Sequence, residues 1–163
     1  MRWNSFYFPS KRDIVPLGEK ERDAIDSAIK LLNGTKLPHK FFISSDVKFF
    51  VDPTIAKSSI LGHTTFFKPN RVILSPLISG GLAWTNNVGI PNNEMQMSTV
   101  IHELTHLQQF RTWKIYGWMI IHLPILNKFT VEKWANENGS AAKDFLEKKY
   151  NEQRRSQVLK NKK

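Results

Sequence analysis

Two histidines and a glutamate stand close together in the pattern His102-Glu103-x-x-His106. If this segment is a helix, histidines four positions apart lie on one face, one turn from each other, where two imidazoles can bind the same metal ion. Glu103 then projects to the side of the pair, where a general base can take a proton from a water molecule held by the metal. The alternative is an ordinary amphipathic helix with packed or exposed histidines, which gives no role to a further carboxylate at Glu132.

The residues around this motif predict the helix that it requires. Asn93 is suited to the N-cap position, and Gln96, three residues later, can complete a capping box. Apolar residues then recur at the i, i+3 and i+4 spacing of one buried face, at Met97, Val100, Ile101, Leu104 and Leu107. Gly117 is expected to interrupt the helix, and the apolar segment 118–126 is expected to pack in the core, with a substrate wall or a membrane-facing patch as the alternatives.

A third protein ligand is expected, because a catalytic zinc site usually has three and leaves the fourth position to water. The metzincin spacing would place glycine and histidine at positions 109 and 112, but the chain has Gln109 and Thr112 there. Glu132 is the better candidate, near the start of a last helix that is predicted from Val131 to about Lys149.

Asn136 is expected to hydrogen-bond to a ligand histidine at the ring nitrogen that does not bind the metal. It lies four residues after Glu132, so the two side chains face the same way, and its carbonyl can accept the outer N–H of a ligand histidine. Glu137 and His122 are the competing ligands, but Glu137 lies off the face of Glu132, and His122 belongs to an apolar run where a packed histidine is commoner. Gly139, inside the same predicted helix, indicates either a break or a close contact between helices.

The chain before the motif predicts one helix and a small sheet. The helix is expected from Glu19 to Asn33, with Gly34 as its stop. Runs rich in β-branched and aromatic residues predict strands at 41–43, 47–51, 62–67 and 71–75, the last two as a hairpin around Lys68-Pro69-Asn70. Residues 79–87 are expected in a long loop that leads to the motif helix, and a long loop beside a site is commonly functional.

The chain resembles a known family at these positions. His102-Glu-Leu-Thr-His106-Leu-Gln-Gln109, followed by Glu132-x-x-Ala135-Asn136, is similar to the gluzincin metallopeptidases, and most similar to their minimal single-domain members, the minigluzincins. The runs 62–67 and 71–75 look like the edge strand and the neighbouring strand that precede the active-site helix in that clan. The resemblance implies an α+β fold: one zincin-like domain with a small twisted sheet, an active-site helix and a C-terminal helix that carries the third ligand.

The resemblance also implies a function, that of a zinc metallopeptidase. Zinc would be bound by His102, His106 and Glu132, with Asn136 supporting a ligand histidine and Glu103 acting as the general base. The alternative is a binding or regulatory protein of the same fold with little turnover, which recruits its partner through the edge strand or the basic tail. The intact Glu103 argues against that alternative, since a scaffold has no need of a carboxylate beside the metal.

The expected partner is a peptide or protein substrate. In the family an extended substrate lies antiparallel to the edge strand and is held by backbone hydrogen bonds, a mode open to any exposed strand. The resemblance therefore implies a substrate-binding segment made of Thr64, Thr65 and Phe66.

Length and composition fit a small globular protein. The 163 residues, 40% of them hydrophobic and 12% aromatic, suit one domain over residues 1–150 and a basic tail over 151–163. The absence of cysteine excludes a disulfide scaffold, a thiolate zinc site and a cysteine nucleophile. The first residues are too short and interrupted for a signal peptide, and no run of 18 apolar residues occurs, so a cytoplasmic location is expected. The protein is also expected to be a monomer.

The formal charge of +10 is concentrated at the end of the chain. Residues 143–163 hold eight basic residues against three acidic ones, which is half of the excess. Such a tail attracts phosphate-rich partners or an anionic membrane surface. Because the tail lacks the interleaved aromatic residues that stack on bases, a solvated tail is the simpler interpretation, and any contact with nucleic acid or an anionic membrane is expected to be weak.

Overall fold

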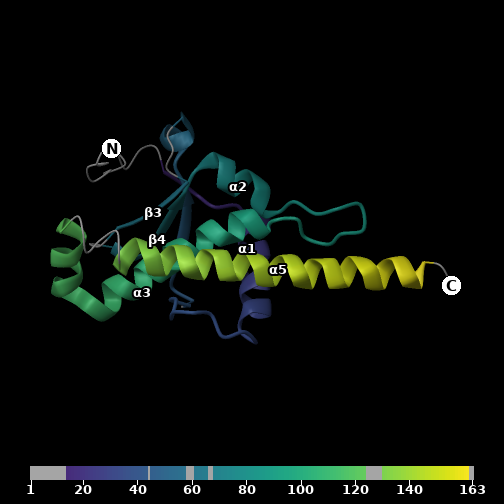
Figure 1. Cartoon of the computed structure of the whole chain (residues 1–163). Helices are drawn as coiled ribbons and strands as arrows, with labels where there is room; N and C mark the ends of the chain where they lie inside the picture. Colours follow the sequence, from purple (N-terminus) through teal and green to yellow (C-terminus); the bar gives the residue numbers. More distant parts are fainter. Residues whose placement is uncertain (1–13, 44, 58–60, 66–67, 124–129, 162–163) are drawn as a thin grey trace.

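The computed structural model describes residues 14–43, 45–57, 61–65, 68–123 and 130–161, and only the backbone course at 56–57, 65, 68–69 and 113–122. Within these residues the fold is α+β, as the sequence predicts: a small mixed sheet packs against helices (Figure 1). The strands are β1 (Val15–Pro16), β2 (Lys48–Val51), β3 (Gly62–Thr65) and β4 (Lys68–Leu74), and a 3-10 helix, η1, spans Pro53–Lys57. The α-helices are α1 (Glu19–Leu32), α2 (Pro76–Leu82), α3 (Glu94–His122) and α5 (Glu132–Lys160).

The sheet has the strand order β1-β2-β4-β3. β2 is parallel to β4, whereas β1 and β3 are antiparallel to their neighbours. Thr64 of β3 is paired with Val72 of β4, and the register shifts between Thr64 and Thr65. β3 is therefore an edge strand, with no strand on its outer side in the described part of the chain.

The apolar face predicted for the motif helix forms part of the core. Each of its five predicted residues is buried, and they pack with buried residues of α1, β4 and α5 in one cluster. The two histidines of α3 are on another face of the same helix, so burial of the apolar face turns them toward α5. Figure 1 shows α5 as the long yellow helix that runs beside α3 and continues beyond the sheet.

A glycine permits the close contact between α3 and α5. A Cβ atom added at Gly139 would lie 2.7 Å from the carbonyl oxygen of Ser98, and backbone atoms leave little room for adjustment. Gly139 marks a close helix contact and not a break, because α5 continues through this position. This contact holds the first turn of α5 near the histidines of α3.

The helices differ from the sequence-based expectation at three places. α3 continues through Gly117 to His122, because one interior glycine costs only about 1 kcal/mol relative to alanine, too little by itself to end a long helix. α5 continues to Lys160 instead of ending near Lys149, so residues 151–160 of the basic tail are helical. Residues 79–81, expected in a loop, belong to α2, which begins with Ser75 as its N-cap and Pro76 in its first turn.

The strand boundaries also differ. β4 begins at Lys68, so the segment expected as the hairpin turn belongs to the strand, and residues 66–67 lie outside the described residues. Residues 41–43 are not a strand, because the N–H of Phe42 donates to the carbonyl of Leu104 on α3. Among the described residues, none of the helices combines the length and the apolar character needed to cross a membrane.

Candidate metal centre

Three side chains that could hold a metal ion meet between α3 and the first turn of α5. His102 Nε2 and His106 Nε2 lie 3.0 Å apart. Glu132 reaches both, with Oε2 3.5 Å from His102 Nε2 and Oε1 3.4 Å from His106 Nε2. In the described chain these three form a group whose candidate ligand atoms all lie within 4.8 Å of one another, and the group could hold a metal ion.

The two imidazoles are held in a fixed mutual orientation by the helix. His102 and His106 are one turn apart on α3, and their rings meet edge to face, with centroids 4.6 Å apart and an interplanar angle of 88°. Their two Nε2 atoms consequently point at the same volume, which Glu132 closes from α5. The predicted meeting of Glu132 with the histidine pair is thus present in the structure.

The charges at this group shift the pKa values of the two histidines in opposite directions. Burial, followed by the nearby charge of His106, lowers the pKa of His102 to about 4, although Glu132 opposes this shift. His102 is therefore unprotonated near pH 7, the state in which an imidazole binds metals. Burial also acts to lower the pKa of His106, but its hydrogen bond with Glu132 and the negative charges of Glu103 and Glu132 raise it. A hydrogen bond with His106 lowers the pKa of Glu132, which keeps this carboxyl ionised.

Glu103 is a residue of α3, and its side chain lies between this helix and the edge strand β3, beside the His102-His106-Glu132 group. Its side chain is buried, and Oε2 accepts a 3.2 Å hydrogen bond from the hydroxyl of Thr64. Burial raises the pKa of Glu103 to about 7, against the opposing effects of the His106 charge and the Thr64 hydrogen bond. Gly62 of β3 is in direct contact with Glu103, because a Cβ atom added there would lie 2.9 Å from the Cγ of this glutamate.

Each histidine also has a side-chain amide as a hydrogen-bond partner. A side-chain hydrogen bond with Asn136 acts to raise the pKa of His102, which puts Asn136 beside this histidine; its support of a metal ligand stays a prediction. The partner of His106 is Gln109, which the sequence reasoning missed: its Oε1 lies 2.9 Å from His106 Nδ1. The signal available in the sequence was the i, i+3 spacing, which places the two side chains on one helix face.

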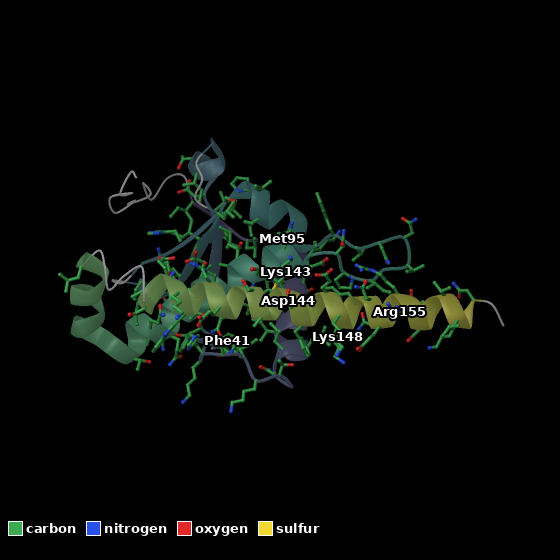
Figure 2. All side chains as sticks on the ribbon, in the orientation of Figure 1. Phe41, Met95, Lys143, Asp144, Lys148 and Arg155 are labelled. Atoms are coloured by element: carbon green, nitrogen blue, oxygen red, sulfur yellow. The ribbon has the colours of Figure 1, made fainter. Side chains whose placement is uncertain are left out.

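A cavity of about 560 Å³ opens over the group and is shared by three elements. β3 contributes one wall with Gly62, His63 and Thr64, and the preceding Leu61 adds to it. The cavity follows α3 from Met95, labelled in Figure 2, to Phe110. α5 and the residue before it contribute the wall that contains Val131, Glu132, Asn136, Gly139 and Ser140. The candidate metal ligands therefore face an open volume beside the sheet edge.

The other residues predicted for the site are not placed in the His102-His106-Glu132 group. Glu137 pairs with His39, its Oε2 lying 2.5 Å from His39 Nε2, and this hydrogen bond lowers the pKa of Glu137. The side chain of His122 lies outside the described residues. The same is true of the Thr65 side chain and of Phe66, so of the predicted substrate-binding residues only Thr64 is placed in full, with its hydroxyl on Glu103.

Comparison of the chain with family models, with curated proteins and with solved structures finds no match. The class of protein is therefore defined by the fold and the site alone. It is an α+β protein in which a His-His-Glu group that could hold a metal ion lies beside a buried glutamate and an edge strand.

Proposed function

We propose that this protein is a zinc-dependent metallopeptidase of the gluzincin type, which hydrolyses peptide bonds in a peptide or protein substrate. The observation that carries the proposal is the position of Glu132. This residue starts a different helix from the His102-Glu103-x-x-His106 motif, yet it contacts both histidines while Glu103 lies against the same cavity.

The donor set suits zinc. Ligand atoms about 2.0–2.1 Å from a tetrahedral ion lie roughly 3.3 Å from one another. The three separations between His102, His106 and Glu132, from 3.0 to 3.5 Å, are close to that value. Two imidazoles and one carboxylate favour zinc over the oxygen-preferring calcium and magnesium ions, and three protein ligands leave the fourth position open.

Zinc bound at this group would supply the chemistry of a Lewis acid, lowering the pKa of a water molecule toward about 7 and polarising a carbonyl group. The residue that moves the proton is Glu103. Its carboxylate would accept a proton from the attacking water and pass it to the leaving nitrogen of the cleaved peptide bond. A raised pKa of about 7 suits a group that has to accept and then release a proton near neutral pH.

The edge strand supplies the surface for the substrate. β3 is paired with β4 on one side, and its other side borders the cavity that contains Glu103 and the candidate metal ligands. An extended peptide could add to this edge as an antiparallel strand, which would carry one of its carbonyl groups across the site. Thr64 contributes its backbone to this role, since its hydroxyl is already bonded to Glu103.

The test begins with chelator-treated protein. The metal-free chain should leave a mixed peptide library intact, and one equivalent of zinc per chain should restore cleavage. Added zinc should not restore cleavage to His106→Ala, which lacks a ligand. A zinc-loaded wild-type chain that leaves the whole library intact would reject the peptidase and support the binding-protein alternative. Cleavage by the metal-free chain would reject the role of the metal.

A further inference from the structure

We propose that Gln109 is the positioning residue of the metal centre: it fixes the proton and the ring orientation of His106 and ties this ligand to the start of the Glu132 helix. The inference rests on the metal-binding role proposed for His106. It adds a residue outside the His102-Glu103-x-x-His106 pattern, and it assigns a role to each end of the Gln109 amide.

The orientation of the Gln109 amide follows from its partners. Its Nε2 lies 3.1 Å from the carbonyl oxygen of Val131, which can only accept a hydrogen bond. The NH₂ end of the amide must therefore face Val131, and Oε1 is left to face His106 Nδ1 at 2.9 Å. Because an amide oxygen can only accept, Nδ1 of His106 has to carry the proton.

This proton assignment prepares His106 for a metal. In a neutral imidazole with the proton on Nδ1, the lone pair is on Nε2. That atom faces His102 Nε2 and Glu132. Without a fixed acceptor, the ring could place its proton on either nitrogen and would lose part of its directed lone pair. Gln109 therefore selects the tautomer that the candidate site needs.

Burial shields the Gln109–His106 hydrogen bond from water. Gln109 is 3% exposed and His106 is 7% exposed, so little water competes for either end of the amide. A hydrogen bond between buried groups is costly to lose when one partner stays behind unsatisfied. The ring of Phe110, nearly parallel to that of His106 at a centroid distance of 6.1 Å, adds a flat wall but no acceptor.

The second bond of Gln109 connects two ligand-bearing elements. Val131 directly precedes Glu132, the first residue of α5. The same amide thus contacts a ligand of α3 and the backbone that delivers the ligand of α5. The hydrogen bond of His102 with Asn136 likewise connects a histidine of α3 with a residue of α5. Both histidines are therefore oriented through contacts that require α3 and α5 to be docked.

The chain offers a matched control for the test. Gln109→Met keeps side-chain length and removes both amide bonds. The control is Gln108→Met, the same change at the neighbouring residue, whose amide donates to the Thr112 hydroxyl on the exposed side of α3. Gln109→Glu keeps an acceptor for His106 but cannot donate to Val131, so it separates the two bonds.

Two readouts are measured on each variant: zinc affinity by competition with a chromophoric chelator, and the NMR signal of the His106 Nδ1–H in zinc-loaded protein. Gln109→Met should lower the affinity about 10–100-fold, as losses of outer partners of metal ligands do, and should expose the Nδ1–H to fast exchange with water. Gln108→Met should leave both readouts at wild-type values. Gln109→Glu should keep the Nδ1–H signal and lose less affinity than Gln109→Met.

The proposal is overturned if Gln109→Met matches the wild type in both readouts, or if Gln108→Met loses as much. Should Gln109→Met fail to fold, Gln109→Glu decides, because loss of its Nδ1–H signal would show that the acceptor is not what positions His106. Zinc binding that depends on Gln109 in a chain that cleaves no peptide would reject the peptidase and keep this inference. Full cleavage with unchanged zinc affinity in Gln109→Met would reject the role of Gln109 and keep the peptidase. A wild-type chain that binds no zinc would reject both the peptidase and the role of Gln109.

Discussion

The hydroxyl of Thr64 on the edge strand donates a 3.2 Å hydrogen bond to Oε2 of Glu103 on α3. The bond is buried, and it connects the strand proposed to hold the substrate to the carboxylate proposed to move the proton. Because Thr64 faces Glu103, the strand and this carboxylate are positioned by one another. The family resemblance implies that Thr64 contacts the substrate, and the structure adds its contact with Glu103.

Thr64→Val should reduce turnover and leave zinc binding unchanged. The change keeps the shape of the side chain and removes the hydroxyl that orients the Glu103 carboxylate. A hydrogen bond to a charged group contributes about 1.5–3 kcal/mol, so kcat should fall roughly 10–100-fold. Thr64→Ser keeps the hydroxyl and should stay near the wild-type rate. Steady-state kinetics on one cleaved peptide, with zinc content measured in parallel, compares the three proteins; equal rates for valine and threonine would remove Thr64 from the positioning of the base.

Gly62→Ala should displace the Glu103 carboxylate. The added Cβ would lie 2.9 Å from the Cγ of Glu103, closer than real contacts allow, and the burial of Glu103 limits its escape. A shift of about 1 Å in a catalytic group can cost roughly 100-fold in rate, while the metal ligands are untouched. The matched control is Gly80→Ala on α2, where the added Cβ would meet no atom within 4 Å apart from its chain neighbours and the nearby backbone of its own helix. Measured kcat/KM at full zinc occupancy should fall for Gly62→Ala alone, and a similar loss in both variants would point to a general effect on the fold.

Substitutions of Glu132, Asn136 and Glu137 at the start of α5 should lower the zinc affinity by very different amounts. Glu132→Ala removes a proposed ligand and should weaken zinc binding severely and abolish cleavage. Asn136→Ala should cost about 10–100-fold in affinity, since it removes the hydrogen bond to His102 only. Glu137→Ala should be nearly silent, because Glu137 is paired with His39 instead. Loss of zinc in Glu137→Ala with retention in Glu132→Ala would show that the third ligand is misassigned.

The basic end of α5 should give weak, salt-sensitive binding to polyanions. Arg155 and Lys160 are exposed, whereas Arg154 donates to the carbonyl of Pro91 and braces the helix against the body. Arg155→Gln combined with Lys160→Gln should therefore weaken binding to duplex DNA and to anionic vesicles without disturbing the fold, and cleavage of small peptides should be unchanged. Binding should fall steeply as salt rises through the physiological range. Binding that is indifferent to salt, or to the double substitution, would place any polyanion contact elsewhere.

The parts of the structure that local patterns determine could be predicted from the sequence. The spacing of His102 and His106 puts them on one helix face, and the apolar residues of the same segment are those that α3 buries. α1 begins at Glu19 as expected and ends within a residue of the predicted Asn33. These features depend on the helix period and on residues close in the chain.

Features that depend on packing between distant segments were missed. The bond of Gln109 to the Val131 carbonyl exists only because α5 docks on α3, and nothing local to Gln109 indicates it. The Thr64 hydroxyl reaches Glu103 because β3 happens to lie against that side of α3. Glu132 is predicted as a ligand from its place at the start of the last helix, and the family resemblance implies the same; the structure places it by the histidines, while zinc and peptide hydrolysis stay predictions.

The central claim, that this site hydrolyses peptide bonds with Glu103 as the base, is tested most directly by Glu103→Gln at equal zinc occupancy. The substitution keeps the size of the side chain and all three proposed ligands, and it removes the proton acceptor. The measurement is the rate of cleavage of a mixed peptide library by zinc-loaded wild type and variant. The account predicts cleavage by the wild type and at least a 100-fold lower rate, roughly the contribution of a general base, in the variant with unchanged zinc content. Equal rates in the two proteins would contradict it.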